Sequence, residues 1–387
     1  MKAKACCIAA VAASLSCLSA ARTWAQGCEI AKFDPRMAVE YAVSDTNGFS
    51  WIDGRYLPLE GKAYANTSLF YDRLPSNVTE KVNAGVRHHM HNSAGMQFRF
   101  RTDSDTLHFK WIPLKEGLAM DHMPSTGVSG IDVYRQTKEG RWFYVKTGRI
   151  HDAKKGGSLK IPWTPGTPCL VNLPLYNGVK SFLLGIKNGS TIEALGPRKS
   201  GIDKPVVFYG TSITHGGCAS RPGLAFPSIV GRDLDVPIVN LGFSGSGVME
   251  LEMSEHLAAI DASCYVLDCL WNMSLREKDR PGRAVETNYE PFIRNLRAKR
   301  PGVPIVMAEA CDVYFKGSRK GMGVYIRKLY EKLVAEGWKN LVFLPDDKMY
   351  TGDGEGTVDG THPNDWGMMS MAKAFESAVA EALGMAR

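Results

Sequence analysis

The sequence has no apolar run long enough to cross a membrane and no basic run interleaved with aromatic residues. A membrane-spanning helix needs about 20 consecutive apolar residues, and a nucleic-acid-binding surface needs clustered Lys and Arg. Neither a transmembrane span nor a nucleic-acid partner is therefore expected. No CxxC pair occurs among the nine cysteines, so their spacing predicts no disulfide framework. With 387 residues, 44% hydrophobic and 22% charged, the chain suits a globular protein of two domains.

Residues 1–25 have the pattern of a signal peptide. Lys2 and Lys4 form a basic start, residues 6–21 are apolar or small, and residues 23–25 offer a small-x-small cleavage site. We therefore expect the chain to be exported to the periplasm, the outer surface or the extracellular space.

The expected mature chain is weakly basic. The signal segment holds three basic residues and no acid, so the net charge of +7 falls by three to +4. A lipid anchor at Cys17 or Cys28 is a lesser alternative, because no convincing attachment pattern precedes either cysteine. Among the other cysteines, Cys264, Cys269 and Cys311 lie in or beside apolar runs, as buried cysteines do. Disulfide pairing stays open at this point.

Residues 29–197 are predicted to form an all-β sandwich of jelly-roll type. Segments such as 96–100, 106–111 and 130–134 alternate apolar and polar residues, which is the period of a half-buried strand. Gly, Pro, Asn and Asp separate these segments, and no long helical period occurs. Many short strands without helices indicate two packed antiparallel sheets.

Residues 201–387 are predicted to form an α/β domain. Apolar runs alternate with amphipathic segments, and the last segment repeats apolar residues at steps of three and four from Met368 to Leu383. The apolar runs are residues 206–209, 237–241, 265–270, 305–308 and 341–344. This alternation predicts a doubly wound parallel sheet whose functional loops follow the carboxyl ends of the strands.

A candidate nucleophile, Ser212, stands where the first of these strands should turn into a helix. Gly210 ends the apolar run, so the serine two residues later is expected at the carboxyl end of the strand. Its hydroxyl and its backbone N–H then point the same way, and one residue supplies both a nucleophile and an oxyanion donor. The alternative is a helix N-cap, a position that serine often fills. A phosphate-binding loop is excluded, because the required Gly-Lys-Ser/Thr ending is absent.

Asp359 and His362 lie three residues apart before the last amphipathic segment. An aspartate at this spacing can hold one imidazole nitrogen, which leaves the other nitrogen free to accept a proton from a serine. The alternative is a surface turn in which the aspartate only caps a short segment.

Taken in order, these segments resemble the SGNH (GDSL) hydrolases. The first and last blocks of that family are matched by residues 210–214 (GTSIT) and 359–363 (DGTHP), and the middle blocks by 240–245 (NLGFSG) and 270–273 (LWNM). The resemblance implies a flavodoxin-like fold, a triad of Ser212, Asp359 and His362, and no cofactor. It also implies an oxyanion hole formed by the backbone N–H groups of Ser212 and Gly245 and the side-chain amide of Asn272.

Two residues depart from the family pattern. Thr211 stands where the family usually has aspartate, and Trp271 precedes Asn272 in place of the usual Gly-x-Asn-Asp sequence. The hydrogen bonds around these positions must therefore differ from those of the family. Trp271 either shapes an acyl or sugar pocket or packs in the core.

The N-terminal half also resembles a known partner of SGNH domains. Residues 130–134 (GIDVY) and 173–179 (LPLYNGV) are similar to a β domain of bacterial secreted SGNH proteins. The resemblance implies hydrolysis of an ester, and the leading expectation is an O-acetyl group on a carbohydrate. Alternatives are a lipase-like or thioesterase activity, or a glycan-binding protein without turnover.

Several other polar residues are candidate sites. In a strand His89 and His91 would share a face and begin a metal site, but no further ligand stands at a recognisable spacing, so no metal is expected. His215 and Arg221 either border the cleft or are solvated residues at a helix start. Asp268, inside an apolar run, is expected to make a buried polar contact.

Overall fold

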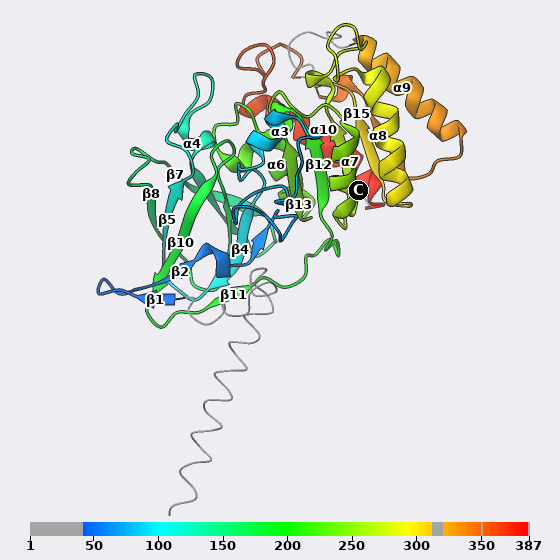
Figure 1. Ribbon diagram of the computed structural model, residues 1–387. Helices are drawn as coiled ribbons and strands as arrows, with labels where there is room; N and C mark the ends of the chain where they lie inside the picture. Colours follow the sequence, from blue (N-terminus) through cyan, green and yellow to red (C-terminus); the bar gives the residue numbers. More distant parts are fainter. Residues whose placement is uncertain (1–41, 312–319, 350, 386–387) are drawn as a thin grey trace, which may run out of the picture.

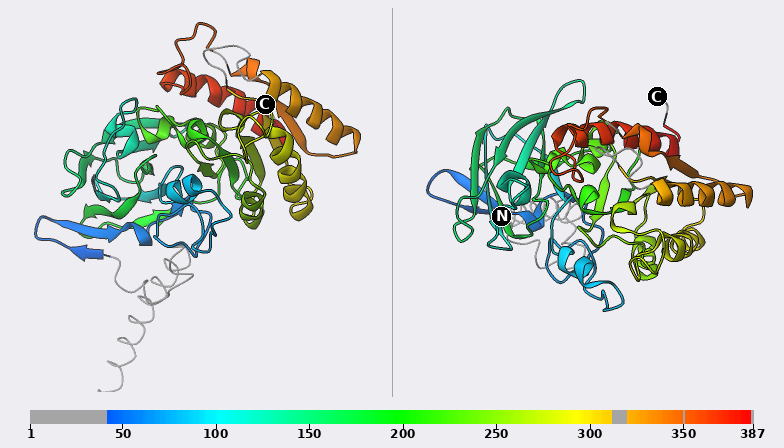
Figure 2. Two further views of the ribbon diagram at one scale, coloured as in Figure 1. Left: turned by 45° about the horizontal axis from the view of Figure 1, so that its top comes forward. Right: turned by 90° about the horizontal axis from the view of Figure 1, so that it is seen from above.

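The computed structural model describes residues 42–311, 320–349 and 351–385, which form two domains side by side (Figures 1 and 2). The predictions for the signal peptide, Cys17 and Cys28 lie outside these residues. No helix within the described part of the chain is long and apolar enough to cross a membrane.

The β domain consists of two antiparallel sheets. One sheet has the order β1 (Ala42–Ser44), β2 (Phe49–Asp53), β10 (Val179–Lys187), β5 (Thr106–Pro113) and β8 (Gly157–Pro162). The other has the order β11 (Ile192–Ala194), β4 (Gln97–Thr102), β9 (Pro168–Asn172), β6 (Ile131–Gln136) and β7 (Trp142–Gly148), with β3 (Leu59–Glu60) paired to β4. Buried and exposed residues alternate along β8, as a strand with one covered face requires. Phe98 of β4 packs on Phe182 of β10, so a continuous apolar core fills the space between the sheets.

Short helices interrupt the β domain, and two of them lie in the long connections that face the second domain. They are η2 (Gly54–Tyr56), α3 (Ala84–His89) and α4 (Ser125–Val128). The two antiparallel sheets and the apolar core between them confirm the predicted sandwich, although it also contains these short helices.

The α/β domain has a five-stranded parallel sheet in the order β13 (Ile238–Gly242), β12 (Val206–Gly210), β14 (Cys264–Asp268), β15 (Ile305–Ala308) and β16 (Leu341–Leu344). In chain order this is 2-1-3-4-5, the flavodoxin-like arrangement, whose switch point lies between β12 and β14. Every residue of β12, β13 and β14 is buried, because helices cover both faces.

The helices divide between the two faces of this sheet. One face is covered by α7 (Leu251–Ala259), α8 (Val285–Lys299) and α9 (Lys320–Ala335), and the other by α6 (Phe226–Asp233) and α10 (Asp365–Ala382). The remaining helical turns are α5 (Ser212–His215), η3 (Pro222–Leu224), η4 (Leu270–Asn272) and η5 (Asp346–Lys348). Phe375 and Val379 of α10 are fully buried, as the predicted apolar face of the last helix requires.

The β domain covers the open edge of the parallel sheet. Strand β13 is an edge strand, and alternate carbonyls along a strand point to the same side. Those of Asn240 and Gly242 accept hydrogen bonds from Arg73 of the β domain, at 3.1 and 2.7 Å. Arg73 is only 1% exposed, so its guanidinium replaces the neighbouring strand that this edge lacks.

A second contact between the domains explains the GIDVY segment. Asp132 of β6 is fully buried and accepts hydrogen bonds from the Arg221 side chain at 2.8 Å and the Gly223 N–H at 2.9 Å. The hydroxyl of Tyr134 also contacts the guanidinium of Arg221. Gly130 is needed because a Cβ there would lie 2.4 Å from the Thr126 carbonyl oxygen. The GIDVY segment, residues 130–134, therefore helps to hold the two domains together.

Candidate active site

Ser212 is the first residue of α5, two residues after the end of strand β12. Gly210 permits the sharp turn, because a Cβ at this position would lie 2.0 Å from the hydroxyl of Thr214. The side chain of Thr211 caps the helix by accepting a hydrogen bond from the Ile213 N–H at 3.2 Å. The N-cap interpretation of Ser212 is therefore wrong, since Thr211 fills that position and leaves the serine hydroxyl free for other contacts.

The loop before α10 brings His362 and Asp359 to this serine. The Ser212 hydroxyl lies 2.8 Å from Nε2 of His362, and Nδ1 of His362 lies 2.7 Å from a carboxylate oxygen of Asp359. With the proton on Nδ1, Nε2 is free to accept a hydrogen bond from the serine. The structure therefore joins the three predicted triad residues in one hydrogen-bonded chain across 150 residues of sequence.

Asp359 is held in its charged form. Partial burial alone would raise its pKa, but hydrogen bonds from the His362 N–H, the imidazole and the Thr361 N–H hold the pKa below its ordinary value of 3.8. The two backbone bonds, at 2.7 and 3.0 Å, also fix the carboxylate at the Nδ1 edge of the imidazole ring. A surface turn capped by Asp359 would account for these two backbone bonds but not for the contact between its carboxylate and the imidazole.

The three predicted oxyanion donors lie at the ends of three adjacent strands, β12, β13 and β14. As the first residue of a helix, Ser212 has a backbone N–H without an intrahelical acceptor. Gly245 lies in the loop after β13 with a φ of +66°, a left-handed conformation that glycine adopts without strain. Its carbonyl oxygen accepts a hydrogen bond of 2.7 Å from Arg283, which holds the peptide unit between Gly245 and Ser246 in place.

Asn272 is tied to the same loop. Hydrogen bonding assigns its amide oxygen to the backbone N–H groups of Ser246 and Gly247, at 3.0 and 3.1 Å. The NH₂ group is then turned away from these two donors, as an oxyanion donor must be. Gly247 is required by close packing, since a Cβ there would lie 2.0 Å from the Gly210 carbonyl oxygen. The loops after the three strands are thus packed against one another.

The β domain buttresses the helix that carries Ser212. The Tyr176 hydroxyl donates a hydrogen bond to the Ser212 carbonyl oxygen at 3.1 Å, and its ring stacks on His215 at 4.0 Å. His215 is fully buried, lies 2.8 Å from the Leu175 carbonyl oxygen, and has a pKa well below its ordinary value because of burial. Both expectations for His215 are therefore wrong: it is a neutral residue of the domain interface.

Arg221 and the histidine run also differ from expectation. Arg221 belongs to the domain interface through Asp132 and is not a solvated residue. The run falls in and after helix α3, where His89 contacts Asn92 at 3.0 Å and His91 contacts Asp72 at 2.9 Å. Because the segment is not a strand, the two imidazoles do not share a face and have separate partners.

The remaining candidates behave as core residues. Asp268 is 2% exposed and accepts a hydrogen bond from the Thr214 hydroxyl at 2.7 Å, and burial raises its pKa to about 7. The half-buried Trp271 packs against both core layers of the α/β domain and donates its indole N–H to the Cys311 carbonyl oxygen. The described cysteines, all buried and free of disulfides, are Cys169, Cys218, Cys264, Cys269 and Cys311.

Sequence reasoning missed four residues around the site: Arg73, Tyr176, His122 and Cys218. Tyr176 lies inside the LPLYNGV segment that carried the resemblance, but nothing in the pattern assigned it a role. The exposed ring of His122 lies 5.3 Å from that of His362, centroid to centroid. His122 and Tyr176 come from connections of the β domain, so no local pattern near Ser212 or His362 indicates them.

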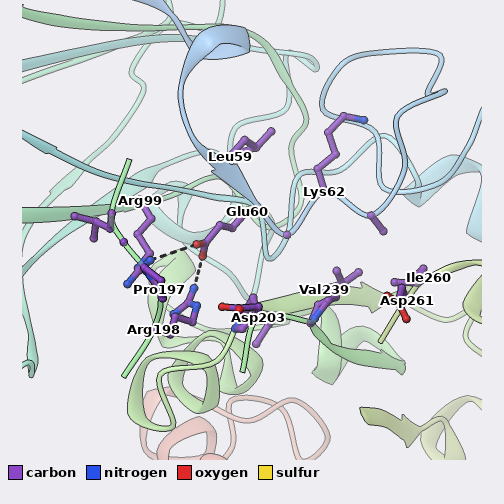
Figure 3. A pocket seen from close by; sticks show the side chains of 17 residues that line it. Leu59, Glu60, Lys62, Arg99, Pro197, Arg198, Asp203, Val239, Ile260 and Asp261 are labelled. Carbon is purple, nitrogen blue, oxygen red and sulfur yellow. Dashed lines mark hydrogen bonds and ion pairs between the residues drawn. The ribbon is translucent and has the colours of Figure 1, made fainter. Parts of the chain in front are cut away.

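A pocket of about 570 Å³ lies away from this site, between the domains (Figure 3). Pro205 and Pro237 in its lining precede β12 and β13, so the pocket is at the amino ends of the strands. Glu60 lies between Arg99 and Arg198 in its wall, with 3.7 Å to the former. The candidate site is at the opposite, carboxyl ends, where parallel α/β sheets bind their ligands.

The fold is that of an α/β protein in which a serine, a histidine and an aspartate are joined by hydrogen bonds at the carboxyl ends of the parallel strands. Residues 203–380 match the GDSL-like lipase/acylhydrolase family, and residues 49–192 match the GxDLY domain, the N-terminus of SGNH-hydrolase-type esterases. The α/β domain of this chain belongs to the GDSL-like lipases and acylhydrolases, and its β domain matches the N-terminal domain of SGNH-hydrolase-type esterases. Comparison with curated proteins finds no significant match.

Solved structures support this assignment. A GDSL-like lipase of Bacteroides ovatus is 29% identical, with a TM-score of 0.75 over 87% of this chain and 99% of that chain. The salicylyl-acyltransferase SsfX3 of a tetracycline biosynthetic pathway is 17% identical, with a TM-score of 0.67 over 88% and 99%. A family two carbohydrate esterase of Clostridium thermocellum, in complex with cellohexaose, is 13% identical, with a TM-score of 0.52 over 75% and 93%. The last two similarities show the fold alone.

Proposed function

We propose that the protein is an exported serine esterase that removes acyl groups, chiefly O-acetyl groups, from carbohydrate. The observation that carries the proposal is the hydrogen-bonded chain from the Ser212 hydroxyl through His362 to Asp359, with contacts of 2.8 and 2.7 Å. A serine is a weak nucleophile alone and becomes reactive when an adjacent base takes its proton. The donors assigned to the oxyanion lie on the neighbouring strand ends.

The reaction follows from these positions in two steps. In the first, Ser212 attacks the ester carbonyl carbon while His362 takes the hydroxyl proton and then delivers it to the departing alcohol. The backbone N–H groups of Ser212 and Gly245 and the amide of Asn272 hold the negative carbonyl oxygen. In the second step, water attacks the acyl-serine, His362 takes a proton from that water, and the acid leaves as Ser212 recovers its proton. Asp359 orients the imidazole and stabilises its positive charge.

Three observations support a carbohydrate ester as substrate. Residues 1–25 have the pattern of a signal peptide, which would bring the enzyme to extracytoplasmic polymers. The two-domain fold is shared with a carbohydrate esterase that was solved with cellohexaose, an analogy of architecture. Trp366, four residues after His362, is 51% exposed and offers an indole face on which a sugar ring can stack.

The nucleophile is tested by Ser212→Ala. We expect folding to be unchanged and turnover of an acetyl ester to fall by roughly four to six orders of magnitude. A serine-directed phosphonate should add its mass at Ser212 in the native protein and nowhere in the variant. Ser158→Ala, in the β domain, is the matched control and should keep full activity. A fully active Ser212→Ala variant contradicts the assignment.

The substrate class is tested with a series of acetyl, butyryl, octanoyl and palmitoyl esters together with an acetylated oligosaccharide. A longer acyl chain contributes about 0.8 kcal/mol per methylene only where the protein buries it. We expect kcat/KM to be highest for acetyl esters and to fall with chain length. A maximum at octanoyl or beyond would replace the carbohydrate esterase with a lipase-like enzyme, and no turnover of any ester would indicate a glycan-binding protein.

A further inference from the structure

Three potential metal ligands converge beside the candidate triad from three separate segments. His122 comes from the connection between β5 and α4 in the β domain, Cys218 follows α5, and His362 precedes α10. One ligand atom from each residue lies within 4.8 Å of the other two. Among the described residues, this is the cluster of histidine, cysteine or acidic side chains that meets this geometry.

The ligand types select a class of cation. Imidazole nitrogen and thiolate sulfur suit Zn²⁺ and similar thiophilic ions, whereas Ca²⁺ and Mg²⁺ prefer oxygen ligands. Tetrahedral Zn²⁺ with bonds of about 2.0–2.3 Å holds its ligand atoms about 3.5 Å apart. The distances between the ligand atoms, now up to 4.8 Å, must therefore shorten by about an ångström for all three to bind one ion. His122 is exposed, so its side chain has space to turn toward the other two ligands.

The backbone at Cys218 is a second, independent observation. Its φ is +70°, the left-handed region that residues other than glycine rarely occupy. A side chain held in that region costs about 1–2 kcal/mol, and such strain is concentrated at functional positions. Cys218 is 5% exposed and follows the hydrogen bond of 2.7 Å from the Gly217 N–H to the Ser212 carbonyl oxygen, which fixes the start of its loop.

We propose that His122, Cys218 and His362 bind Zn²⁺ or a similar thiophilic divalent cation, and that the bound ion inhibits the enzyme. Both ring nitrogens of His362 are engaged in the resting site, Nε2 with Ser212 and Nδ1 with Asp359. An ion on either nitrogen must break one of these hydrogen bonds. An ion on Nε2 occupies the nitrogen that accepts the serine proton, and an ion on Nδ1 displaces the Asp359 carboxylate that orients the ring. Either arrangement impairs His362 as a general base.

Binding is an exchange of a proton for a metal ion. The ion forms a bond to sulfur and releases the thiol proton to the solvent, since a coordinated thiol is deprotonated.

The binding part of the proposal is tested without any enzyme assay. Co²⁺ added to the full-length chain should give the absorption band of thiolate-to-cobalt charge transfer. Cys218→Ser should abolish this band, and His122→Ala should weaken it. His151→Ala, which removes an exposed histidine elsewhere in the β domain, is the control and should leave it unchanged. Absence of the band in the native protein overturns the site, whatever the enzyme's substrate.

The inhibitory part rests on the proposed esterase function and is tested by rate. Zn²⁺ should inhibit acetyl ester hydrolysis by the native protein, and EDTA should restore the rate. His122→Ala and Cys218→Ser should keep the uninhibited rate and require about tenfold more Zn²⁺ or higher for the same inhibition. His122→Ala carries the test if Cys218→Ser does not fold. Equal sensitivity of native protein and His122→Ala overturns the proposal. A charge-transfer band in a protein that hydrolyses no ester refutes the esterase and leaves the metal site standing.

Discussion

Arg73 is expected to position the oxyanion loop although it touches neither the nucleophile nor the substrate. Its guanidinium donates to the carbonyl oxygens of Asn240, Gly242 and His89, at 3.1, 2.7 and 2.7 Å. Burial lowers the pKa of Arg73 to about 9, so it remains charged at neutral pH. The ring of Phe243, the next residue along from Gly242, lies 4.7 Å from its central carbon. The loop that carries Gly245 starts here.

The cost of Arg73→Met can be worked out from these contacts. Three hydrogen bonds to a charged donor contribute about 1.5 kcal/mol each at the low end, or about 4.5 kcal/mol together. Methionine keeps the packing on Phe243 and removes the cost of burying a charge, which returns about 1–2 kcal/mol. We therefore expect a loss of about 3 kcal/mol, a fall in Tm of about 6–12 °C. A shift of about 1 Å in the loop should lower kcat tenfold to a hundredfold.

Thermal unfolding and steady-state kinetics on an acetyl ester test this reasoning, with Arg198→Met as the matched control. Arg198 also links the domains, through Glu60 and Asp235, but at the amino ends of the strands. Its loss should lower Tm and leave kcat within about twofold of the native value. Arg73→Lys should recover part of both losses because it restores the charge. An Arg73→Met variant that loses stability but keeps its native kcat would refute the positioning role.

Three further predictions concern single side chains. Asn272→Ala should lower kcat by about a hundred- to a thousandfold with little change in KM, as loss of a donor to the transition state does; an effect on KM alone would contradict this role. Asp268 has a pKa of about 7 in the folded chain against an ordinary 3.8, so the folded state binds the proton more tightly and stability falls as pH rises between these values. Asp268→Asn still accepts from Thr214, and its Tm should change less between pH 5 and pH 8 than that of the native protein, unless burial does not raise this pKa. Trp366→Ala should raise KM for an acetylated oligosaccharide but not for a small acetyl ester; equal effects on both would remove its sugar-stacking role.

The parallel sheet could be predicted because its strands are buried on both faces. Uninterrupted apolar runs at residues 305–308 and 341–344 coincide with β15 and β16, and the run at 237–241 is displaced by one residue from β13. The run at 265–270 extended too far, because the chain turns into η4 at Leu270. Apolar residues continue into that turn, so composition alone does not mark the end of the strand.

Only part of the candidate site could be predicted from the sequence. Ser212, Asp359, His362, Gly245 and Asn272 stand in local sequence blocks, and the structure brings the three triad residues together as those blocks predict. Their catalytic roles remain predictions. The contacts of Arg73 with β13 and of Tyr176 with α5 join segments far apart in the sequence. Contacts between such distant residues produce no periodic pattern in the sequence. From the sequence alone, a buried arginine in a loop cannot be distinguished from a charged residue on the surface.

Ser212 and His362 are separated by 150 residues, so the parts of the candidate site are synthesised at different times during translation. The β domain leaves the ribosome first, and Arg73 and Tyr176 are in place before β13 and α5 are made. The nucleophile follows, but its base arrives only with the loop before α10. A nascent chain that has been translated as far as α9 therefore holds an inert serine. The hydrogen-bonded chain from Ser212 to Asp359 can therefore form only when the last helix packs against the sheet and brings Asp359 and His362 with it.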